Sequence, residues 1–164
     1  MQLDPAEQRA VEIVDRVGWM VQHVYPVETN SDPEWFSYTV GLGITHGWPE
    51  LICFGLDPEV MGKMINNAVY ELKEKKIVPY YGLELDEVLE LSSVKLETFP
   101  KKFFLSYLGW AIWFSDYRGM KPQQFACLQL TWPDKQGFFP RDTNCDPVAS
   151  RVQTPKGVRP VALS

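Results

Sequence analysis

Two segments far apart in the chain carry the polar side chains that could do chemistry. The first motif, residues 38–51, reads YTVGLGITHGWPEL, and the second motif, residues 129–142, reads QLTWPDKQGFFPRD. Phenol, imidazole, carboxylate and guanidinium groups bind polar ligands and, when they converge, transfer protons. The candidate residues for binding a ligand or partner are Tyr38, Thr39, His46, Glu50, Gln129, Trp132, Asp134 and Arg141. No residue is assigned a catalytic role.

Each candidate in the first motif has a structural and a functional interpretation. Tyr38 lies in a predicted strand, where a buried hydroxyl group needs a hydrogen-bond partner. His46 follows in a loop beside Trp48, where it either titrates near neutral pH and binds an anion or is simply solvated. Glu50 is either a buried carboxylate paired with a tryptophan N–H, an amide or an arginine, or an exposed residue at the edge of the sheet.

The second motif allows the same two interpretations. Gln129 alternates with apolar neighbours on a predicted strand, so its amide needs a partner across the sheet or on a ligand. Asp134 follows Trp132 and Pro133 and is placed to form an Asx-turn ahead of Gly137. Arg141 and Asp142 could form a local ion pair.

Known catalytic and metal-binding signatures are missing from the sequence. It contains no GxSxG, GxxxxGK[ST], GxGxxG or HExxH pattern, and its two histidines do not suggest a metal site or a cofactor. Cys53, Cys127 and Cys145 lack CxxC spacing, so we expect three free thiols. Cys145 is expected to lie exposed in a loop, and it would react fastest with an alkylating reagent.

Pattern and capping signals predict where the elements lie. We expect helices over residues 5–16, 57–76 and 100–117, strands over 19–25, 35–42, 50–56 and 124–132, and one or two further strands within 87–99. The stripe of Val60, Met61, Met64, Ile65, Ala68, Val69 and Leu72 indicates the buried face of the second helix. Paired strands with helices inserted between them favour an α+β fold. We therefore expect one domain over residues 1–164, with a mostly antiparallel sheet of five or six strands, two or three packed helices and an irregular tail from about residue 143.

Composition narrows the class of partner. The chain has 164 residues and a formal net charge of −5, without a basic block, which disfavours binding to nucleic acid. Its start lacks the basic and apolar regions of a signal peptide, and no apolar run reaches the ~20 residues that span a bilayer. We therefore expect no membrane association and a cytoplasmic location. Aromatic residues make up 13% of the chain and are enriched at recognition surfaces, and Trp110 and Trp113 could form a homo-oligomer interface.

The two motifs together resemble a known family. GWMVQHV, the first motif and the segment CLQLTWPDKQGFFP are similar, in this order, to the bacterial and phage-type family designated domain of unknown function 4262. The resemblance implies no activity. Many members of that family have an aromatic residue after the final FP, where this chain has Arg141. A fainter similarity links the first motif to suppressor-of-fused-like domains, which are interaction modules.

These observations favour a small non-catalytic binding module of an accessory, immunity or counter-defence type that recognises a protein or a small polar ligand. The alternative is a small cofactor-independent enzyme, such as a hydrolase, whose site combines Tyr38, His46, Glu50, Asp134 and Arg141. Both motifs leave an apolar strand at a turn rich in Gly and Pro, and function concentrates on such loops. We therefore predict that the two motifs lie side by side and form one functional surface.

Overall fold

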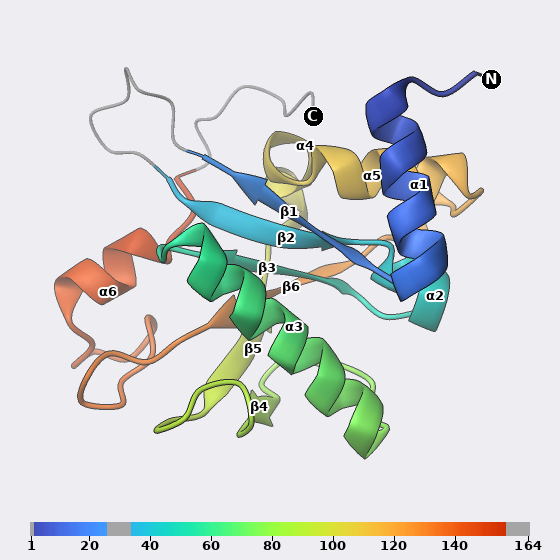
Figure 1. Ribbon diagram of the computed structural model, residues 1–164. Helices are drawn as coiled ribbons and strands as arrows, with labels where there is room; N and C mark the ends of the chain where they lie inside the picture. The colour runs from blue at the N-terminus through green and yellow to red at the C-terminus, as the bar shows by residue number, and fades with distance from the viewer. Residues whose placement is uncertain (1, 26–33, 157–164) are drawn as a thin grey trace.

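The computed structural model describes residues 2–25 and 34–156 and shows a mixed α+β fold (Figure 1). Its strands are β1 (Met20–Val24), β2 (Phe36–Val40), β3 (Glu50–Phe54), β4 (Glu84–Leu85), β5 (Val94–Thr98) and β6 (Cys127–Thr131). Its α-helices are α1 (Pro5–Val17), α2 (Leu42–His46), α3 (Pro58–Lys75), α4 (Phe104–Tyr107), α5 (Gly109–Tyr117) and α6 (Pro147–Val152). Two 3₁₀ turns, η1 (Lys101–Phe103) and η2 (Pro122–Gln124), complete the described elements.

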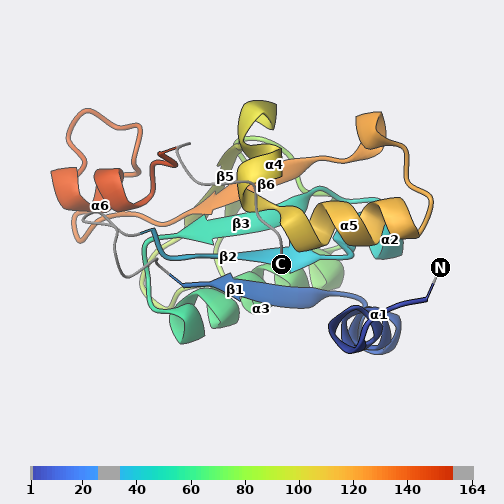
Figure 2. The ribbon, with the colours of Figure 1, turned by 90° about the horizontal axis from the view of Figure 1, so that it is seen from above.

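The strands form one sheet in the order β1-β2-β3-β6-β5-β4. All neighbouring strands are antiparallel except β3 and β6, which run parallel with Glu50 opposite Cys127. Helix α3 covers one face of the sheet, and α4 and α5 lie on the other (Figures 1 and 2). The prediction of an α+β fold with a mostly antiparallel sheet of five or six strands is confirmed, and the short helices α2 and α6 come in addition to the predicted ones.

Helix α3 forms where its capping residues predict it. The Asp57 side chain accepts a hydrogen bond from the Glu59 backbone N–H, Pro58 occupies the first turn, and Lys76 ends the helix in a left-handed conformation with φ of 56°. The predicted stripe is fully or almost fully buried against the sheet from Met61 to Leu72. Val60 is the exception, because 44% of its surface stays exposed.

The opposite layer is a cluster of aromatic rings. Phe36, Phe54, Phe99 and Tyr107 pack with ring centroids 5.1 to 6.0 Å apart, and Phe103 lies 5.9 Å from Tyr107. Rings at this spacing gain edge-on and offset contacts in addition to their burial. Much of the unusual aromatic content therefore serves the core.

The predicted helix over residues 100–117 is divided into η1, α4 and α5. The break lies at Leu108, whose backbone has φ of −113° and ψ of 34°, and Gly109 begins α5. Tyr107 and Leu108 are both fully buried. In a continuous helix, the side chains of neighbouring residues point about 100° apart. We attribute the break to the simultaneous burial of the Tyr107 and Leu108 side chains.

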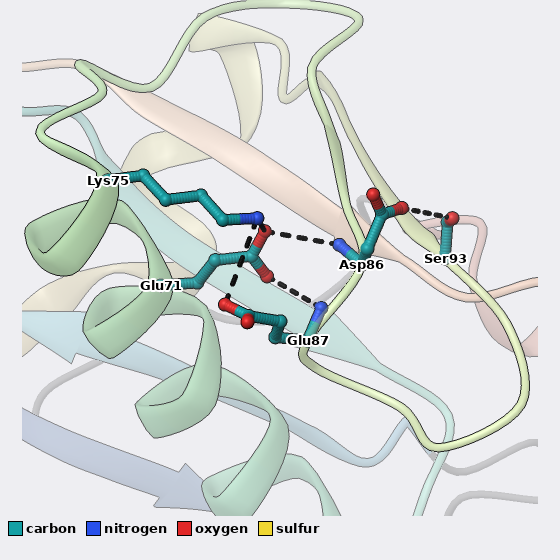
Figure 3. A network of polar contacts seen from close by, with 5 residues as sticks. All are labelled: Glu71, Lys75, Asp86, Glu87 and Ser93. Atoms are coloured by element: carbon teal, nitrogen blue, oxygen red, sulfur yellow. Dashed lines mark hydrogen bonds and ion pairs between the residues drawn. The ribbon is translucent and has the colours of Figure 1, made fainter.

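A buried carboxylate fixes the segment between α3 and β5. Glu71 accepts hydrogen bonds from the backbone N–H of Glu87 at 2.8 Å and of Asp86 at 3.2 Å, and Lys75 Nζ lies 2.8 Å from Glu71 Oε2 (Figure 3). Ser93 Oγ donates to Asp86 at 2.7 Å, which closes the loop. Only residues 94–98 of the predicted strand region 87–99 are a strand, because Glu71 binds the preceding backbone in place of a neighbouring strand.

The predicted exposure of Cys145 is wrong. The residue is buried, and its thiol donates to the carbonyl oxygen of Phe138 at 3.6 Å. Burial, followed by the charge of Asp134, raises the pKa of this thiol. All three cysteines are free, as predicted. Helix α6 forms within the segment expected to be irregular, with Asp146 as its N-cap.

Replacing Ile65 with alanine should destabilise the fold by ~2 to 5 kcal/mol, because the fully buried side chain would leave a cavity under the sheet. Val60→Ala on the same helix is the matched control and should change the free energy of unfolding by less than ~0.5 kcal/mol. Urea denaturation measures both. Equal effects of the two substitutions would contradict the assignment of the buried face.

Candidate functional site

Tyr38 serves the core of the fold. The side chain is fully buried, and its hydroxyl oxygen accepts a hydrogen bond from the Trp110 backbone N–H at 3.0 Å. This contact satisfies the second amide of α5, one of the first-turn amides that lack a partner within their own helix. Burial raises the pKa of Tyr38 far above its usual range, so the phenol stays neutral.

Thr39 and Glu50 form the polar centre of the first motif. The Thr39 hydroxyl donates to Glu50 Oε1 at 2.7 Å, and the backbone N–H groups of Leu42 and Gly43 donate to the same carboxylate at 3.1 and 3.2 Å. Thr39 Oγ1 in turn accepts from the Leu51 N–H at 2.8 Å. Of the two alternatives for Glu50, the structure shows the buried, paired carboxylate, and its partners are a hydroxyl and backbone amides at the start of α2 rather than a tryptophan or an arginine.

Helix α2 occupies the segment predicted to be a simple loop. Gly41 precedes it with φ of 101°, and a Cβ atom there would lie 2.5 Å from Val14 Cγ1 of α1. The glycine therefore permits both the left-handed turn and the close approach of α1. Glu50 supplies the acceptors that the free amides of α2 need. The main role of the first motif is therefore to stabilise the connection between β2 and β3.

His46 ends α2 and stacks on Trp48, with ring centroids 4.3 Å apart. Its Nε2 atom is buried and has no hydrogen-bond partner among the described residues. Burial, with a smaller contribution from Lys73, lowers the pKa of His46, so the ring is neutral at physiological pH. A neutral, stacked ring is poorly suited to the anion binding considered from the sequence.

The second motif forms the predicted Asx-turn. Asp134 Oδ1 accepts hydrogen bonds from the backbone N–H of Gln136 and of Phe138, both at 2.9 Å, and Oδ2 accepts from the Asp146 N–H at 2.7 Å. These amides lower the pKa of Asp134. Trp132 donates its indole N–H to the Phe54 carbonyl at 2.8 Å and so joins the ends of β6 and β3. The ion pairs of the described residues do not include one between Arg141 and Asp142.

The two motifs do not lie side by side. Glu50 of the first motif begins β3 beside Cys127, the start of β6. Trp132 of the second motif follows the end of β6, where it contacts Phe54 at the end of β3. Because these two strands are parallel, the motifs leave opposite ends of the sheet, and α2 and α6 mark these ends in Figure 2. The prediction of one shared surface, and of a catalytic site combining His46 with Arg141, is wrong.

A different cavity brings together residues that the sequence does not connect. It measures about 260 Å³ and lies against β5 and β6, between η1 and the segments on either side of α6. Its polar lining residues include Glu97, Gln129, Thr131, Arg141 and Gln153. We call it the Glu97 cavity. Of the candidates from the sequence, Gln129 and Arg141 line this cavity, whereas Trp132 and Asp134 line another one.

Glu97 differs from the other buried carboxylates. Four of the described glutamate residues are at least nine-tenths buried, and Glu34, Glu50 and Glu71 all accept hydrogen bonds. Glu97 is 8% exposed, yet its Oε2 atom has no hydrogen-bond partner in the described part of the chain. Buried polar atoms are nearly always paired, so an unpaired buried carboxylate oxygen demands an explanation.

Sequence reasoning missed Glu97, Thr131 and Gln153. Glu97 and Lys95 alternate with apolar residues in VKLET, a pattern typical of a strand with one solvent-exposed face. Because Glu97 lies opposite Gln129 in the register of β5 and β6, that face instead forms the floor of the cavity. Gln153 closes the cavity. Its backbone carbonyl accepts a hydrogen bond from Gln129 Nε2 at 2.6 Å, and its side-chain amide accepts from the N–H of Trp132 and donates to the carbonyl of Trp132.

Two larger cavities are less suited to polar recognition. One, of about 700 Å³, lies beside Asp134 and Cys145, whose polar atoms are engaged in the turn described above. The other, of about 580 Å³, lies beside Trp48 and Arg118, and Arg118 is paired with Asp15 at 2.6 Å. Neither contains a buried unpaired charge in the described residues.

Comparison with known families agrees with the resemblance of the two motifs. The model of the domain of unknown function DUF4262 matches residues 13–146. The chain belongs to the DUF4262 family. No curated protein and no solved structure matches it. The DUF4262 match includes Glu97, Gln129 and Arg141 but ends before Gln153, so the residues that close the cavity lie beyond it.

Residues 2–25 and 34–156 contain no cluster of three or more His, Cys, Asp or Glu side chains that could hold a metal ion. Within the same ranges, none of the helices combines the length and the apolar character required to cross a bilayer.

The contribution of Glu50 to the stability of this DUF4262 protein should fall between pH 4.5 and about 7, because burial raises the pKa of Glu50 from 4.5 to about 7. In that interval Glu50 of the folded protein holds a proton that the unfolded chain has released, so this contribution decreases as pH rises, while the lowered pKa values of His23 and His46 act in the opposite direction. The contribution is on the order of 3 kcal/mol. Urea denaturation across this pH range should show that Glu50→Gln reduces the slope. Glu90→Gln, at an exposed position, should leave it unchanged, and an unchanged slope in Glu50→Gln would contradict the assignment.

Proposed function

We propose that this protein is a non-catalytic binding module that holds a small polar ligand in the Glu97 cavity. The observation that carries the proposal is the buried Glu97 Oε2 atom, which lacks a partner in the described residues. A carboxylate oxygen removed from water without a hydrogen bond costs free energy, and a bound ligand that donates to it would offset that cost.

The walls of the cavity support a ligand of metabolite size. Phe103, Pro100, Pro140 and Pro155 supply apolar surface around the polar floor. Small-molecule sites combine such walls with a few polar groups that fix orientation, and they measure about 300 to 1,000 Å³ for drug-sized ligands. A volume of about 260 Å³ falls just below this range, which favours a small metabolite.

The lining favours binding over catalysis. Among the described residues that line the cavity, Glu97 is the only carboxylate, and no cysteine, histidine or serine is present. A hydroxyl nucleophile needs an adjacent general base that takes its proton. The Thr131 hydroxyl donates its hydrogen to the Lys95 carbonyl at 2.8 Å, which is not a base that could activate it.

Stability measurements on Glu97→Gln test the proposal in the absence of ligand. Replacing a buried unpaired charge with a neutral isostere should stabilise the unliganded protein by roughly 1 kcal/mol. Glu84→Gln on the neighbouring strand β4 is the control, since Glu84 is exposed, and it should have almost no effect. A loss of stability in Glu97→Gln would show that this carboxylate is a structural group with a partner of its own.

Ligand capture tests the same cavity directly. Small molecules that copurify with the native protein would be identified by mass spectrometry and then ranked by thermal shift. Thr154→Trp places a large ring at the exposed rim of the cavity and should abolish these thermal shifts while the protein remains folded. Thermal shifts that persist in Thr154→Trp would place the ligand elsewhere.

A further inference from the structure

The hydrogen-bonding groups at the floor of the Glu97 cavity are mostly acceptors. Gln129 donates one N–H of its amide to the Gln153 carbonyl, and the Gln129 Oε1 oxygen remains an acceptor. Thr131 donates its hydroxyl hydrogen to the Lys95 carbonyl, which leaves lone pairs on its oxygen. Glu97 Oε2 accepts from no described residue.

Gln153 does not alter this balance. Its side-chain Nε2 donates to the carbonyl groups of Trp132 and Ala149, at 2.8 and 3.2 Å, and its Oε1 accepts from the Trp132 N–H at 2.9 Å. The amide is therefore fully engaged in holding α6 against the end of β6. A ligand that reaches the floor of the cavity must itself donate hydrogen bonds.

The cavity is lined by one negatively charged and one positively charged side chain. Glu97 supplies a negative charge at the buried floor, opposite Gln129 in the sheet. Arg141 lines the same cavity and, unlike Glu97, is exposed to solvent. Neither residue takes part in an ion pair with another described residue. A ligand that complements both charges carries a cation at its inner end and an anion at its outer end.

We infer that the ligand of the Glu97 cavity is a small zwitterion, such as a free α-amino acid, with its ammonium group on Glu97 and its carboxylate on Arg141. This inference rests on the proposed function. The ammonium group offers three N–H donors to the acceptors of Glu97, Gln129 and Thr131, and the arginine fork matches a carboxylate in a bidentate geometry. The apolar walls accommodate a side chain.

Binding measurements with three matched probes test the inference. The proteinogenic amino acids would be ranked by thermal shift, and the tightest would be compared by calorimetry with its N-acetyl derivative and with the amine that lacks the carboxylate. N-acetylation should abolish binding, because it removes the cation. Loss of the carboxylate should weaken binding roughly tenfold to a hundredfold, as expected for one hydrogen-bonded charge.

Two variants test which residue binds each end of the ligand. Glu97→Gln should eliminate binding of both the amino acid and the amine. Arg141→Gln should weaken binding of the amino acid to the level of the amine and leave the amine unaffected. Arg151→Gln on the exposed face of α6 is the matched control and should change neither affinity.

The outcomes separate this inference from the function on which it rests. Equal affinity for an amino acid and its N-acetyl derivative would overturn the zwitterion. A neutral or anionic ligand whose binding is blocked by Thr154→Trp would also overturn it, while the proposed binding function would stand. If neither the copurified molecules nor the probes bind in a manner that Thr154→Trp abolishes, both the inference and the proposed function are wrong.

Discussion

The parallel pairing of β3 with β6 is the constraint on which the rest of this structure depends. It joins two strands separated by more than seventy positions in the chain, at the centre of an otherwise antiparallel sheet. Because parallel strands begin at the same edge, the pairing brings Glu50 close to Cys127 and Trp132 close to Phe54. The two motifs therefore lie at opposite ends of the sheet. The polar residues of β5 and β6 that line the Glu97 cavity are a separate feature of the sheet.

Each motif satisfies backbone groups at its own end. Glu50 accepts the free amides at the start of α2, and Asp134 accepts three amides of the turn that leads to α6. Glu71 does the same for the segment before β5. In this fold, carboxylates that accept several N–H hydrogen bonds stabilise the irregular connections. The motif carboxylates, which suggested chemistry from the sequence, therefore have structural roles.

Glu97 stands apart because its strand neighbours provide no donor. Gln129, directly opposite, directs its amide hydrogen to the backbone after α6. The glutamate is thus placed on a covered face of the sheet with an unsatisfied oxygen. Proteins retain such groups where the loss of stability is compensated by function, which is the basis for proposing a binding site here.

The sequence by itself determined the local elements and the family. Asp4 and Asp57 cap α1 and α3 close to the predicted helix starts, because capping depends on a few neighbouring residues, and alternation located the central strands. Tertiary structure alone decided the direction of the β3–β6 pairing, the break at Leu108 and the burial of Cys145. It also decided which carboxylate would lack a partner. Strand direction and the partners of a buried polar group depend on residues distant in the chain, and no local pattern of Glu97 or Glu50 distinguishes the unpaired one from the paired one.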